Sequence, residues 1–183
     1  MIHAFPCGTL ALDLLGTLRE RRNPVPKEWL GTPKLLDSWF VESGLMDREP
    51  GSDASDLAAT LALRESVYAL VEARLAGRGL PAEAVAVVNR HAEQVPVLAQ
   101  LGPRGASRSG SASQGLAAIA REVVEIIGGR DAELLRECGR PECTQVYLDR
   151  SRGGRREWCA MSTCGNRVKA AAFRARRRSL AEV

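Results

Sequence analysis

Four cysteines near the C-terminal end constrain the fold more than any other feature of this 183-residue chain. They form two pairs in the pattern C-x4-C-x15-C-x4-C, and the residues are Cys138, Cys143, Cys159 and Cys164. Each pair supplies two thiolates from one turn and the intervening loop brings the pairs together, which is the ligand arrangement of a tetrahedral structural zinc site. We therefore predict that these residues bind one Zn²⁺ ion. The metal supplies folding free energy to a short segment with few large apolar side chains.

Three other uses of four cysteines fit the sequence less well. Disulfides are disfavoured because the N-terminal residues lack the basic lead and cleavage site of a secretory signal, and thiols stay reduced in the cytoplasm. An iron–sulfur cluster fits the symmetrical pairs and the expected strand hairpin poorly. A catalytic zinc keeps one position open for water, whereas four equivalent thiolates close the coordination sphere. Structural zinc is favoured over all three.

The residues around the cysteines predict a knuckle, a β-hairpin and a helix. Gly139 and Pro141 allow a tight turn between the first two cysteines. The segments VYLD and RREW are typical of short strands, and Gly153-Gly154 would join them. A helix is expected from about Gly165, with Asn166 as its cap. This order is treble-clef-like.

Positive charge is concentrated in the same part of the chain. Residues 136–183 hold twelve Lys and Arg against five Asp and Glu, whereas residues 1–135 hold fourteen against seventeen. Within the expected helix, Val168 and three alanines form a narrow stripe that we expect to pack on the hairpin or the knuckle, and the remaining faces are basic. A polyanionic partner is therefore expected for this segment only.

Arginine-rich helices suit duplex DNA, because guanidinium groups bind phosphates and pair with guanine edges in the major groove. The candidate DNA-contacting residues are Arg155, Arg156, Arg167, Lys169, Arg174, Arg176, Arg177 and Arg178. Tyr147, Trp158 and Phe173 are few for a base-stacking platform, so duplex DNA is favoured over single strands, although RNA is not excluded. The simpler alternative is a solvated arginine face that maintains solubility.

The first 135 residues have the periodicity of a helical domain. We expect helices over 10–22, from Thr32-Pro33 to near Gly44, from Ser52 or Asp53 to Gly77, from Pro81 to about 91, and from a Ser113 cap to about 128. The Gly- and Ser-rich segment 102–113 is either a flexible connection or the tip of a weak hairpin. The sequence thus predicts a mainly α protein, with a helical domain at 1–135 and the zinc module at 136–183.

Nothing in the helical part predicts catalysis. His3 and His91 are far apart in sequence and lack a catalytic setting, and Cys7 is expected to be a small buried side chain. We therefore predict that the protein is not an enzyme. No apolar run is long enough to span a membrane, and a cytoplasmic location is expected. A small-molecule effector of the helical domain and a homodimer are both compatible with the sequence, which identifies no ligand-binding residue.

The motif Cys164-Gly165-Asn166-Arg167, with Trp158 upstream and the basic alanine-containing helix downstream, resembles the CGNR zinc-finger family. The segments ALDLLGTL, TPKLLDSWF and ALRESVYAL are similar to the ABATE-type domain that precedes this finger. Gly16 stands where an Asn precedes the Thr in that domain's opening motif. The resemblance implies a bacterial, stress-linked transcription regulator in which the four cysteines bind zinc and the finger contacts DNA.

Two functional hypotheses follow from the sequence. In the first, the protein is a DNA-binding transcriptional regulator with a structural zinc site made of four cysteines. In the second, it is a zinc-stabilised protein–protein interaction module whose basic helix binds an acidic partner. Preference for one duplex sequence over another favours the first, because a binder of acidic surfaces does not read base edges.

Overall fold

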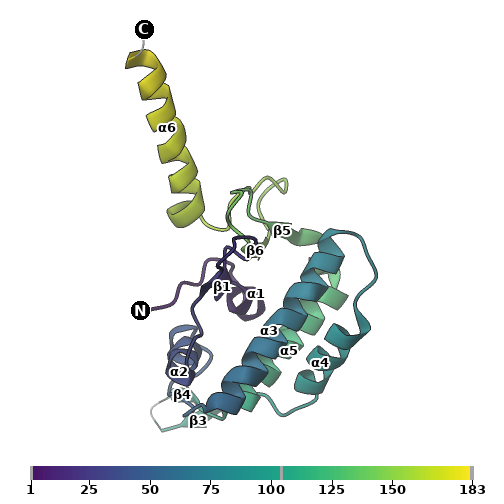
Figure 1. Ribbon diagram of the computed structural model, residues 1–183. Coiled ribbons are helices and arrows are strands. Elements are labelled where there is room, and N and C mark those ends of the chain that lie inside the picture. Colours follow the sequence, from purple (N-terminus) through teal and green to yellow (C-terminus); the bar gives the residue numbers. More distant parts are fainter. Residues whose placement is uncertain (1, 104, 182–183) are drawn as a thin grey trace.

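The computed structural model describes residues 2–103 and 105–181, and Figure 1 shows a helical body from which one helix extends. The α-helices of the described residues are α1 (Leu10–Leu15), α2 (Pro33–Glu42), α3 (Ala54–Leu75), α4 (Ala82–Ala92), α5 (Ala112–Gly128) and α6 (Asn166–Ala181). The strands are β1 (Leu18–Arg19), β2 (Lys27–Glu28), β3 (Ala99–Gly102), β4 (Gly105–Arg108), β5 (Leu135–Glu137) and β6 (Val146–Leu148). A 3-10 helix, η1, spans Arg130–Leu134, and a π-helical turn, η2, spans Met161–Gly165. The mainly α fold class is confirmed.

Helices α3 and α5 run side by side through the body, and α4 lies against both (Figure 1). The Asp53 side chain caps α3 and forms a capping box with Asp56, while Gly77 with φ +63° follows the end of the helix. The cap of α5 is Ser111, two residues before the expected Ser113. Ser111 is preferred because Gln114 stands three residues later and completes a second capping box.

Helix α2 begins as the sequence predicts. The Thr32 side chain accepts a hydrogen bond from the backbone of Leu35, and proline occupies the first helical turn. The Phe40 ring then packs so closely on Gly115 of α5 that a Cβ there would lie 2.6 Å from a ring carbon. Glycine at 115 therefore allows α2 to approach α5.

The first helix is shorter than expected. Helix α1 ends at Leu15, and the chain continues as β1, which pairs antiparallel with β2. The prediction of a helix over 10–22 is wrong because side chains beyond Gly16 bond to other elements: Arg21 pairs with Glu65 at 2.5 Å, and Arg22 with Glu137 at 2.6 Å. These contacts hold the turn between β1 and β2 against the body.

The Gly- and Ser-rich segment 102–113 was expected to be either a flexible connection or the tip of a hairpin, and the structure shows the hairpin. Strand β3 pairs with β4, with Gly102 opposite Gly105 at the tip. Both strands are exposed, and Leu101 is 90% exposed. The hairpin lies at the end of the body farthest from α6 (Figure 1).

The predicted pairing in the C-terminal part is wrong. Strand β6, within VYLD, pairs antiparallel with β5, which precedes the first cysteine, and residues 155–158 form no strand. Leu135 of β5 is buried opposite Leu148, so this pairing joins the segment to the core of the helical body. Residues Gly153 and Gly154, both with positive φ, do form a turn, but it leads into an irregular segment.

One buried core extends from the helices into the C-terminal part. It includes Leu12 of α1, Leu63 of α3 and Ile119 of α5, and it continues through Tyr147 of β6 to the cysteines. None of the helices in the described residues is both long and apolar enough to cross a membrane. The cysteine segment is thus packed against the body, whereas α6 is not.

Candidate metal centre

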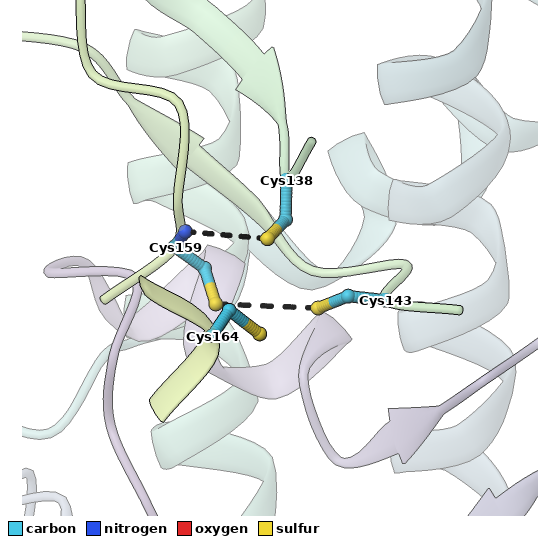
Figure 2. Close-up of side chains that lie close together, drawn as sticks. All are labelled: Cys138, Cys143, Cys159 and Cys164. Atoms are coloured by element: carbon cyan, nitrogen blue, oxygen red, sulfur yellow. Dashed lines mark hydrogen bonds between the residues drawn. The ribbon is translucent and has the colours of Figure 1, made fainter. Parts of the chain in front are cut away.

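The four cysteines predicted from the sequence spacing come together in one cluster. Their sulfur atoms all lie within 4.8 Å of one another, and every side chain is buried. Figure 2 shows the sulfurs gathered between the chain segment that carries Cys138 and Cys143 and the segment that carries Cys159 and Cys164. The Cys143 and Cys159 sulfurs are 4.0 Å apart. A tetrahedral zinc with bonds of about 2.3 Å places its sulfurs about 3.8 Å apart. Four thiols at these separations fit Zn²⁺, and none of them forms a disulfide.

The first pair is held by β5, β6 and the turn between them. The Cys138 backbone N–H donates to the Gln145 carbonyl at 2.9 Å, which extends the ladder by one step past Glu137. The Cys143 N–H donates to the Arg140 carbonyl at 2.8 Å and closes the knuckle. A Cβ on Gly139 would lie 3.2 Å from the carbonyl oxygen of Glu157, so glycine permits the second segment to pass close by.

The second pair approaches from the opposite side. Cys159 follows the irregular segment, and its N–H points at the Cys138 sulfur 3.5 Å away (Figure 2). Cys164 lies in the π-helical turn η2, which continues directly into α6. Asn166 is the first residue of α6, with helical φ and ψ, and not the extended cap that the sequence suggests. A metal held by Cys164 therefore fixes the start of α6.

Without a metal, the four clustered cysteines cannot all ionise easily. The Cys138 pKa is lowered because Cys143 and Cys159 donate hydrogen bonds to its sulfur. The Cys143 pKa is raised in return, and donation to Cys138 raises the pKa of Cys159 to about 12. Only one of the three ionises readily in this cluster, whereas a central divalent cation stabilises all of the thiolates together. Binding Zn²⁺ would thus ionise thiols that the metal-free cluster keeps protonated.

The Arg156 side chain makes its contacts inside the zinc module and with the N-terminal segment. Its guanidinium stacks over the Tyr147 ring at 4.2 Å, and it donates to the carbonyl oxygens of Trp158, Cys159 and Pro6. Its backbone N–H donates to Asp149 at 3.1 Å. We assign Arg156 to the packing of the cysteine loop on the N-terminal segment, and we leave it out of the candidate DNA surface.

Helix α6 carries most of the other candidate DNA-contacting residues. Arg167, Lys169, Arg174, Arg176, Arg177 and Arg178 are exposed on it, and Arg155 is exposed in the preceding loop. The Arg177 guanidinium lies 5.9 Å from the centre of the Phe173 ring. The expectation that the small-residue stripe packs on the module is wrong: Val168 is half-buried, but Ala171, Ala172 and Ala175 are exposed. The π-helical turn directs α6 away from the body, as Figure 1 shows.

The two histidines and Cys7 lie in buried or half-buried positions in the fold. His3 is buried, with Nε2 3.1 Å from the Leu35 carbonyl oxygen, and burial lowers its pKa. Burial also lowers the pKa of His91, which is half-buried on α4. Cys7 is buried, as expected, and burial raises its pKa well above the usual range.

Two polar residues beside the cluster were not found from the sequence. The Gln145 side chain accepts a hydrogen bond from the Cys7 thiol at 2.9 Å, and Arg140 lies 3.7 Å from Glu142 and 4.0 Å from Glu20. Burial opposes the charged form of Arg140, but four neighbouring groups, Cys164, Cys143, Glu142 and Glu20, together raise its pKa. Arg140 lies between Cys138 and Cys143 in the sequence, and this position could have predicted that it lies beside the metal site.

Comparison with known families agrees with this architecture. Residues 8–130 match the family model ABATE, described as "putative stress-induced transcription regulator". The chain belongs to the ABATE family. Residues 135–177 of this ABATE protein match the CGNR zinc finger, so both resemblances stated from the sequence are confirmed. No curated protein matches the chain. The four clustered cysteines all lie within the CGNR match and account for its zinc.

Proposed function

We propose that this ABATE protein is a DNA-binding transcription regulator that presents α6 to duplex DNA. The observation that carries the proposal is the combination of charge and exposure on this helix. Residues 166–181 include six Lys and Arg and no Asp or Glu, and the basic side chains are all exposed. A 16-residue helix is about 24 Å long and can lie in a major groove about 12 Å wide.

The zinc centre supports this role by orienting the helix. Cys164 lies in the turn just before α6, and its three companion ligands belong to two segments packed on the helical body. When zinc is bound it supplies a rigid joint of known geometry. The chain's own residues then hold the first turn of α6 in one direction, so that phosphate contacts by the arginines fix the register of the helix on DNA.

Two further parts of the proposal concern reaction and location. We propose a non-catalytic role, because the described His and Cys residues have packing or thiol-cluster environments. A cytoplasmic location is proposed because free thiols of this kind persist in a reducing compartment. Both follow from the same interpretation of the protein as a regulator.

The second candidate function is a protein-interaction module. Phe173 is 53% exposed in the middle of the basic helix. An aromatic side chain flanked by arginines suits a groove on an acidic protein, in which it would serve as an anchor. DNA is favoured because the basic residues extend around α6, whereas Phe173 is the one large apolar side chain exposed among the α6 side chains that the structure describes.

The experiment is a selection of zinc-loaded protein on a pool of random duplexes at roughly physiological salt. The proposal predicts an enriched sequence motif, which is lost for the variant with both Arg174→Gln and Arg178→Gln. The matched control is Arg78→Gln with Arg90→Gln, two exposed arginines of the helical body, and it keeps the motif. Absence of enrichment with full zinc occupancy contradicts sequence-specific DNA binding and favours an acidic protein partner.

A further inference from the structure

A cavity of about 190 Å³ lies where the helical body meets the metal centre. One wall comes from the β1–β2 hairpin. It contains Arg19 of β1, Lys27 of β2 and Trp29, which follows β2. The opposite wall comes from the finger, with Arg140 and Arg167, and it includes three of the four clustered cysteines. The cavity is therefore built from residues of both family segments.

The charged lining is predominantly positive. Four cationic side chains line the cavity against the single carboxylate of Glu20, which bonds to Lys27 at 2.9 Å. In the described part of the chain, no carboxylate lies within ion-pair distance of Arg19 or Arg167. A zinc ion with four thiolates carries a net charge of −2, which the lining cations also balance. Arg140 is further neutralised by Glu142, 3.7 Å away, so Arg19 and Arg167 are the lining cations left to bind an anion.

The rest of the lining is mixed, because the polar side chains of Thr144, Gln145 and Thr163 lie beside apolar residues. Ala4 and Pro6 contribute aliphatic surface, and Trp29 contributes an indole whose face is held under the Arg19 guanidinium, 5.1 Å from the ring centre. Arg19 is further fixed by donation from Nε to the Gly16 carbonyl at 3.2 Å. A concave site that combines an aromatic wall with charged and polar groups can fix the orientation of a small molecule. The volume is below that of drug-sized pockets and suits a small metabolite.

We infer that this cavity binds a small organic monoanion, a carboxylate with a short apolar body. The carboxylate accepts charge-assisted hydrogen bonds from Arg19 on the body and Arg167 in the first turn of α6, and the apolar body lies against Trp29. The bound anion links the helical body to α6. Because the cavity wall includes cysteine ligands, zinc loading and anion binding are coupled, and each changes the affinity for the other by the same factor. The inference does not depend on DNA binding.

The test is isothermal titration of the zinc-loaded full-length protein, without DNA, using acetate, benzoate and the neutral isostere benzamide. Benzoate is expected to saturate with a Kd of about 1 mM or tighter and to bind at least about tenfold more tightly than benzamide. Arg19→Gln and Arg167→Gln should each weaken benzoate binding by about tenfold. The exposed Arg78→Gln variant is the charge-matched control and should bind as the wild type does.

Three results would overturn the inference. One is the absence of saturable binding of either carboxylate up to about 10 mM. Another is equal affinity for benzoate and benzamide, which would exclude a role for charge. The third is unchanged benzoate affinity in both arginine variants when their zinc content and circular dichroism match the wild type. Because DNA is absent from the titration, these failures would leave the proposed regulator function standing.

Discussion

The Cys7 thiol donates a hydrogen bond of 2.9 Å to the side-chain oxygen of Gln145, a residue 138 positions further along the chain. Both side chains are buried, and the Gln145 amide nitrogen lies 3.4 Å from the Gly16 carbonyl oxygen, to which it donates. A Cβ at residue 16 would lie 2.7 Å from the same side-chain oxygen, so glycine makes room for the amide. Gln145 lies between Cys143 and β6, and it thus joins the cysteine segment to the residues on either side of α1.

Replacement of Gln145 by alanine should weaken this joint and leave the metal in place. The variant loses two buried hydrogen bonds and leaves the Gly16 carbonyl without this donor, so the free energy of unfolding should fall by about 1–3 kcal/mol. Chemical denaturation measures the change, and metal analysis should still give one zinc per chain. Gln100→Ala on the exposed hairpin is the control and should change stability by less than about 0.5 kcal/mol. An unaltered denaturation midpoint in Q145A would show that the joint contributes nothing.

Cys159→Ser should abolish stoichiometric zinc and unfold the cysteine segment, because three thiolates and a hydroxyl do not hold a structural site. Hydrogen exchange should become fast for the amides of β5 and β6, while those in the middle of α3 and α5 stay protected. Cys7→Ser provides the matched control, since Cys7 lies outside the cluster, and it should retain zinc. Stoichiometric zinc in C159S would refute the four-thiolate assignment.

The sequence predicted the metal site more accurately than the strands around it. Cysteine spacing and helix caps are local signals: Thr32, Asp53 and the two cysteine pairs each need only neighbours within a few residues. Strand pairing depends on distant partners. VYL has the same β-propensity whether it pairs with RREW or with LRE, and burial of Leu135 in the helical core decides for LRE. The direction of α6 likewise depends on a π-helical turn that helical periodicity does not report.

Stability should depend on pH through Asp13. Burial raises the pKa of this carboxyl from 3.8 to about 6, so the folded state holds its proton more tightly than the unfolded state does. The resulting stabilisation is complete below pH 3.8 and is lost as the pH rises through 6. Asp13→Asn keeps an oxygen acceptor for the Cys7 N–H and carries no charge. Relative to the wild type, the variant should gain up to about 3 kcal/mol between pH 4 and pH 7.

Urea denaturation of both proteins over this range measures the gain. The acid sensitivity of zinc binding is common to the two proteins, so it cancels from their difference. A stability difference that does not change with pH would mean that the Asp13 carboxyl titrates alike in the folded and unfolded states.

The most direct measurement for the central claim is the salt dependence of binding to a mixed-sequence DNA duplex. Zinc-loaded wild type, the double variant Arg174→Gln/Arg178→Gln and the control Arg78→Gln/Arg90→Gln are compared between about 50 and 200 mM salt. The account predicts that the double variant binds more weakly and that its log K against log salt slope is shallower by about 1.8, from two lost phosphate contacts. The control should match the wild type. Equal slopes for all three proteins, or no binding by the wild type, would contradict the assignment of α6 as the DNA-contacting helix.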